Sequence, residues 1–140
     1  TMRSHPILAT LLLVGACGGG TYFTTLNASP SASPSDAIAC ARSKLKELSY
    51  RQTSFDEIGN RVTASKADHS VSHPDPQFRQ NSDRLEIEAA AGADGRTALT
   101  VVGHTFAEYF TQRGPTEVEE HASTAVKQAA EAIVQSCGQA

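Results

Sequence analysis

The chain has 140 residues, a length typical of one ordinary domain. Its 12 Lys and Arg against 15 Asp and Glu give a formal charge of −3, which excludes the broad basic surface of a nucleic-acid-binding protein. With 39% hydrophobic residues the chain is too apolar to be wholly disordered, and three cysteines are too few for a disulfide-packed miniprotein.

The N-terminal segment has the pattern of a signal peptide. Arg3 supplies a positive charge, residues 7–14 are an apolar run, and the small residues Gly15 and Ala16 follow. A helix that spans a bilayer needs roughly 20 apolar residues, so this run is too short for a transmembrane anchor. The pattern therefore predicts a signal peptide over residues 1–16.

Cys17 directly follows the small residues and completes the sequence Val14-Gly15-Ala16-Cys17. This segment resembles the type II signal peptide, with its lipobox, of bacterial lipoprotein precursors. The resemblance implies cleavage before Cys17 and acylation of Cys17 with fatty acids such as palmitate. Several acyl chains together anchor a protein on a lipid bilayer. The alternative is an ordinary secretory signal that happens to end in a cysteine.

The position after the cysteine bears on localisation. In proteobacterial lipoproteins, the absence of Asp there usually directs the protein to the outer membrane, and this chain has Gly18. The resemblance therefore implies a lipid-anchored protein of the bacterial cell envelope, on the outer membrane and facing the periplasm.

Residues 17–34 are rich in Gly, Ser, Thr, Ala and Pro and carry no charge. This composition predicts a flexible tether between the membrane and the folded domain. Tyr22, Phe23 and Leu26 are exceptions, for which we expect loose order. Two alternatives stay open for these three residues: contact with the membrane interface, or a short edge strand.

Helical patterns lie near both ends of the remaining chain. Residues 35–48 place apolar side chains on one face after a capping Ser35, which predicts a first helix. Thr116 and Glu119 form a capping box ahead of a long apolar stripe that ends near Gly138. These features predict a second helix over residues 117–137.

The segments between the helices favour strands. Residues 50–55 and 60–67 predict one hairpin, and residues 85–89 and 97–105 predict a clearer one. The polar, proline-containing segment 68–83 is predicted to be a disordered loop. We therefore expect a single α+β domain over residues 35–138. It is a two-layer sandwich in the order α-β-β-β-β-α, with an antiparallel four-stranded sheet covered by two helices.

Cys40 and Cys137 lie on the two predicted helices. If the helices pack side by side in an oxidising compartment, the two thiols can form a disulfide that closes nearly the whole domain. The alternative is a pair of buried free thiols. Neither cysteine has the neighbouring base or Cys-x-x-Cys spacing of a reactive thiol.

The sequence contains no convincing catalytic or metal-binding constellation, so no cofactor is expected. His69 and His73 lie beside Asp68 and Asp75, but a proline-rich loop lacks the rigid spacing of a metal site. His104 is interpreted as a half-buried, hydrogen-bonded strand residue. The alternating residues Glu86 and Glu88, and His121 on the second helix, are interpreted as solvent-exposed.

These observations favour a membrane-anchored lipoprotein that is a non-enzymatic binding or structural module, with an envelope protein as a possible partner. The alternative function is small-molecule or metal binding through the 68–83 loop. Catalysis stays a minor hypothesis that requires His104 in a pocket with a carboxylate partner.

Overall fold

The computed structural model describes residues 22–139. Six strands form one antiparallel sheet in the order β1-β5-β4-β3-β2, with β6 also paired to β5. The elements in chain order are β1 (Thr24–Ala28), α1 (Pro34–Glu47), β2 (Arg51–Asp56), β3 (Arg61–Asp68), β4 (Phe78–Ala91), β5 (Thr97–Thr111), β6 (Gly114–Glu120) and α2 (Thr124–Cys137).

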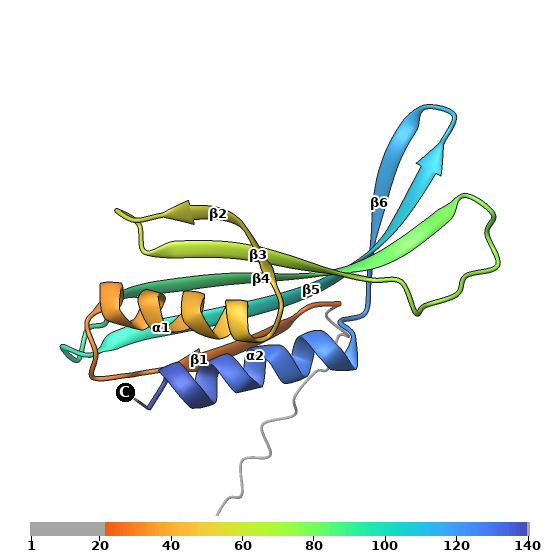
Figure 1. The fold of residues 1–140 in the computed structure, drawn as a ribbon. Helices are drawn as coiled ribbons and strands as arrows, with labels where there is room; N and C mark the ends of the chain where they lie inside the picture. The colour runs from red at the N-terminus through yellow and green to blue at the C-terminus, as the bar shows by residue number, and fades with distance from the viewer. Residues whose placement is uncertain (1–21, 140) are drawn as a thin grey trace, which may run out of the picture.

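Both helices cover the same face of the sheet (Figure 1). The predicted α+β class, with an antiparallel sheet under two helices, is therefore confirmed. The sheet has six strands instead of four, and the order is β-α-β-β-β-β-β-α.

The core lies between the helices and the central strands. Buried aliphatic side chains come from α1, α2, β4 and β5, namely Ile38, Leu45, Val126, Ile133, Leu85, Ile87, Leu99 and Val101. Gly103 on β5 lets α2 approach closely, because a Cβ there would lie 3.1 Å from the Cγ2 atom of Val126.

Strand β1 corrects the predicted tether over residues 17–34. Residues 24–28 pair with residues 99–103 of β5, and Leu26 and Ala28 pack against the core. Only alternate residues of this short edge strand are partly buried, so the strand needs few apolar side chains. Its composition is therefore like that of a tether. The predicted signal peptide (residues 1–16) and Cys17 lie outside the described residues.

Helix α1 is close to its prediction. Its N-cap is Ser33 instead of Ser35, and the Ser33 hydroxyl accepts a hydrogen bond of 3.2 Å from the backbone N–H of Asp36. The helix ends at Glu47, and Ser49 then adopts a left-handed conformation with φ 65°. This turn leads the chain directly into Tyr50 and β2.

The predicted loop 68–83 is wrong over its second half. Residues 78–83 are strand. The pairing of β4 with β3 reaches as far as Asp68, the last residue of β3, and β4 pairs with β5 along most of its length. Asp83 is stable in this buried stretch because its carboxylate accepts hydrogen bonds from neighbouring hydroxyl groups, whereas the Oδ1 atom of buried Asn81 has no partner among the described residues. The connection between β3 and β4 is residues 69–77.

The predicted helix 117–137 begins too early. Residues 114–120 form β6, which pairs with the distal half of β5, and α2 begins at Thr124 with Ser123 as its N-cap. The Thr116–Glu119 capping box is therefore part of a strand. The long β5 offers an open edge beyond β1, and pairing with it replaces the helical turn that the motif favours.

The start of β4, the end of β5 and β6 extend past the two helices as a projecting arm (Figure 1). We use the term arm for residues 78–82 and 106–120. Its sheet has no helix over it.

Candidate functional site

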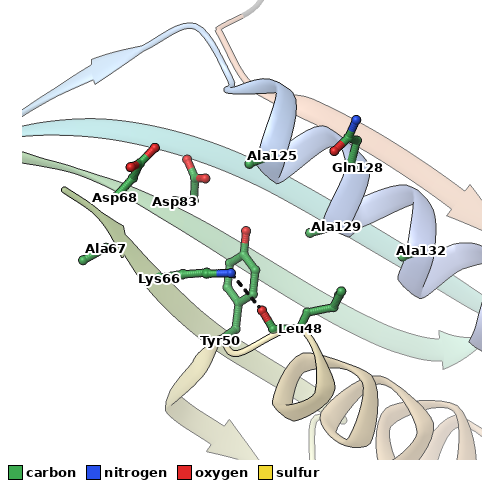
Figure 2. Close-up of a pocket in the computed structure, with 10 residues that line it drawn as sticks. All are labelled: Leu48, Tyr50, Lys66, Ala67, Asp68, Asp83, Ala125, Gln128, Ala129 and Ala132. Carbon is green, nitrogen blue, oxygen red and sulfur yellow. Dashed lines mark hydrogen bonds between the residues drawn. The ribbon is translucent and has the colours of Figure 1, made fainter. Parts of the chain in front are cut away.

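A pocket of about 570 Å³ lies where α1 ends and α2 continues along the sheet (Figure 2). Residues from the α1–β2 turn, β3, β4 and α2 line it. These are Leu48, Tyr50, Lys66, Ala67, Asp68, Asp83, Ala125, Gln128, Ala129 and Ala132. This volume is within the range of typical small-molecule sites.

The α2 wall of the pocket is made of small side chains. Ala125, Ala129 and Ala132 recur at helical spacing, with Gln128 beside them (Figure 2). Because alanine side chains reach only a short way from the helix, they leave space between α2 and the sheet that larger residues would fill. Leu48 adds a further apolar contact from the end of α1.

Tyr50 projects into this space from the turn after α1. Its backbone N–H donates a 2.9 Å hydrogen bond to the Leu45 carbonyl, which positions the residue at the entrance to β2. The side chain is only 7% exposed, and its hydroxyl points into the space between Asp83 and α2 (Figure 2). That hydroxyl has no hydrogen-bond partner in the described part of the chain.

Burial, and to a lesser extent the charge of the Asp83 carboxylate, raises the pKa of Tyr50 above its ordinary value. The hydroxyl is therefore protonated at neutral pH and can donate a hydrogen bond to an incoming group.

Asp83 is 4% exposed and lies beneath the start of α2. Its Oδ1 accepts hydrogen bonds from the Thr105 hydroxyl at 2.6 Å and from the Ser123 hydroxyl at 2.9 Å. The Ser123 hydroxyl in turn accepts from the backbone N–H of Val126, and the Ser123 N–H donates to the Thr105 oxygen. This network attaches the N-terminus of α2 to the sheet beside the pocket.

Lys66 and Asp68 follow each other on the same face of β3, at the edge of the pocket (Figure 2). The Lys66 ammonium donates a 3.2 Å hydrogen bond to the Leu48 carbonyl, which leaves further N–H donors free. Asp68 accepts from the hydroxyl and the backbone N–H of Ser70, and these bonds lower the pKa of its carboxyl group.

The pocket holds donors and carboxylates. Tyr50, Lys66 and Gln128 can each donate, whereas the Asp68 and Asp83 carboxylates already accept hydrogen bonds from neighbouring hydroxyl groups. The arrangement can bind a molecule that has an apolar body and a hydrogen-bond acceptor.

The predicted disulfide is confirmed. Cys40 on α1 and Cys137 at the end of α2 are bonded, with a Cα–Cα distance of 5.7 Å. The bond joins the two helices that cover the sheet. Cys17, the predicted lipidation site, lies outside the described residues.

His73 lies in the 68–83 segment, which was the alternative ligand or metal site, and its ring has other contacts. The His73 ring stacks on Phe78, its Nε2 lies 3.2 Å from the Tyr109 hydroxyl, and its Nδ1 accepts from the backbone N–H of Asp75. Over residues 22–139, no group of three or more His, Cys, Asp and Glu side chains is placed to hold a metal ion.

His104 is half-buried and hydrogen-bonded, as its strand position predicted. Its Nδ1 lies 2.7 Å from Glu119, and its Nε2 lies 3.8 Å from Glu86. His104 alternates with Thr105 along β5 and so faces away from the helices and the pocket. Glu86, Glu88 and His121 are exposed, as expected.

A binding role for Tyr50, Lys66 or Asp83 was not predicted from the sequence. A signal was present, because Lys66 continues the buried alternation of Val62 and Ala64, and Asp83 continues that of Leu85 and Ile87. A charged residue at a core-facing strand position indicates either a satisfied network or a binding site.

No protein-family model matches the chain, and no curated protein sequence is significantly similar to it. Neither helix in the described region is long and apolar enough to cross a membrane.

Proposed function

We propose that this protein is a lipid-anchored lipoprotein of the bacterial cell envelope whose domain binds a small ligand without catalysing a reaction. The lipobox ending at Cys17 supports the anchor, and Gly18 supports an outer-membrane location facing the periplasm. The pocket beside α2 supports the binding role and replaces the 68–83 loop as the candidate ligand site.

One observation carries the binding proposal. The Tyr50 hydroxyl is held in a largely buried residue, points into the pocket and has no protein partner among the described residues. The hydroxyl oxygen itself is accessible from the pocket, so it can donate to a bound ligand, and a hydrogen bond to a charged acceptor contributes about 1.5–3 kcal/mol.

The free donors of the pocket favour a small carboxylate with an aliphatic body, although the charges of Asp68 and Asp83 limit its affinity. The Lys66 ammonium and the Tyr50 hydroxyl can both donate to a carboxylate. The alanine wall of α2 and Leu48 can contact the aliphatic part. We therefore use hexanoate as the probe, with hexanol and hexylamine as matched molecules that lack the carboxylate.

The test is a titration followed by backbone amide chemical shifts. Hexanoate is expected to shift the amides of residues 125–132 in a saturable way, and hexylamine is not. Tyr50→Phe is expected to weaken binding at least about tenfold, because a hydrogen bond to a charged acceptor contributes about 1.5–3 kcal/mol.

Two further variants sharpen the titration. Lys66→Met should weaken hexanoate binding and leave hexanol unaffected, whereas Lys46→Met, an exposed lysine on α1, serves as the matched control. Ala132→Phe should block both probes by filling the pocket. The proposal is overturned if hexanoate and hexylamine shift the same amides equally, or if neither shifts them.

A further inference from the structure

Few residues of the chain separate the first described residue from the proposed lipid anchor. Tyr22 is five residues after Cys17, and an extended chain of that length spans at most about 18 Å. The predicted tether of residues 17–34 would have allowed a larger separation, but β1 already begins at Thr24. An acylated Cys17 therefore brings the start of β1 near the headgroups.

Exposed aromatic side chains occupy this end of the domain. Tyr22 is 51% exposed and Phe23 is 42% exposed. Tyr22 stacks on His121 with ring centroids 4.6 Å apart, and its carbonyl accepts a 2.7 Å hydrogen bond from the Ala122 N–H. Phe23 lies 5.3 Å from the His104 ring. These contacts order the two aromatic residues although they are exposed to solvent.

The charges beside these rings do not suggest attraction to anionic lipid. Glu119 pairs with His104, and Glu86 lies on the other side of the same ring. Tyrosine and histidine combine an apolar ring with a polar tip, which suits the boundary between headgroups and acyl chains. The chemistry fits the interface of a zwitterionic bilayer.

We propose that Tyr22, Phe23 and His121 form a membrane-contacting patch, which seats the domain directly on the bilayer that holds the acyl chains of Cys17. The proposal rests on the acylation of Cys17 in the proposed function. The arm is expected to stay in solution, because Phe110 lies seven residues along β5 from Gly103, which pairs with the start of β1, and a strand of that length spans about 23 Å.

The absence of Trp from the chain makes a direct test available. The chain from Cys17 onward keeps the helices and strands of residues 22–139, and Cys17 is its only free thiol because Cys40 and Cys137 are bonded. We would couple Cys17 to a maleimide lipid in phosphatidylcholine vesicles. Phe23→Trp would report on the patch, and Phe110→Trp, at a residue 57% exposed on the arm, is the matched control.

Lipids brominated near the headgroup should quench Phe23→Trp emission and shift it to the blue, and leave Phe110→Trp unchanged. Equal quenching of the two variants, or no quenching of either, would overturn the proposal. Because the coupling is chemical, the result does not depend on natural acylation. A missing acyl group on the cellular protein would overturn the proposed lipid anchor, and it would not change the result of the vesicle experiment.

Discussion

At the scale of single residues, Asp83 shows how a polar side chain becomes part of a core. It occupies a strand position where the alternation of Leu85 and Ile87 places an apolar residue, and hydroxyl groups from β5 and the α2 N-cap satisfy its carboxylate. Burial, with a smaller contribution from the Asp83 charge, raises the pKa of Tyr50, which stays a hydrogen-bond donor in the pocket.

Asp83→Ala is expected to lower the free energy of unfolding by about 2 kcal/mol, because the hydroxyl groups of Thr105 and Ser123 lose their acceptor. Chemical denaturation measures the change. The exposed Glu57→Ala variant should change stability by less than about 0.5 kcal/mol. Equal effects of the two substitutions would contradict the role assigned to Asp83.

Tyr50 should also make stability depend on alkaline pH. Its folded-state pKa is raised above 10.0, so its contribution is fully present below the unfolded pKa and is lost as the pH rises through the folded pKa. Denaturation at about pH 9 and about pH 11 should show a smaller loss of stability in Tyr50→Phe than in the wild type. Identical losses would show that Tyr50 is not buried as described.

The candidate site could be predicted only in part from these residues. Periodicity gives the faces of β3 and β4, and extending it by two residues places Lys66 and Asp83 on the covered side. The pocket itself depends on where α1 stops relative to α2. That relation is set by the tertiary packing of the helices, for which a single sequence has no periodic signal.

At the scale of elements, strong local patterns were reliable, whereas the two strands that pair with the outer edge of β5 were not predicted. Helix α1, β3 and the centre of the β4–β5 hairpin follow apolar periodicity that the local sequence displays, and β2 follows from its short turn to β3. Strands β1 and β6 exist because the long β5 offers its edge to each of them in turn. Such pairing is non-local, so a capping motif at Thr116 and a tether-like composition before Pro34 gave wrong predictions.

The arm should open without unfolding of the whole domain. Strand β6 pairs only with β5, most of its residues are exposed, and no helix covers it. In native-state hydrogen exchange, the β6 amides bonded to β5 should exchange faster than the amides of Val101 and Leu85. Equal protection at both places would show that the arm folds as one unit with the core.

At the scale of the whole molecule, the Cys40–Cys137 bond joins the two helices over a sequence separation of 97 residues. The loop-entropy model assigns about 4.7 kcal/mol to a closed loop of about this length. The bond lies at the C-terminal end of α2, whereas residues 125–132 of α2 line the pocket.

The double variant Cys40→Ser and Cys137→Ser is expected to lose about 2–5 kcal/mol of stability. Thermal or chemical unfolding under non-reducing conditions measures it, and reduction of the wild type should reproduce the loss. A wild-type protein whose stability is unchanged on reduction would contradict the stabilising role of the bond.

The lipid anchor is the claim on which the location of the domain, its contact with a bilayer and its place in the envelope all depend. The most direct measurement is the intact mass of the protein purified from membranes of a bacterial host, with Cys17→Ser as the control. We expect a chain that begins at Cys17, carries the added mass of acyl groups and gains two hydrogen atoms on reduction. An unmodified chain, or one released into the soluble fraction with Cys17 free, would contradict it.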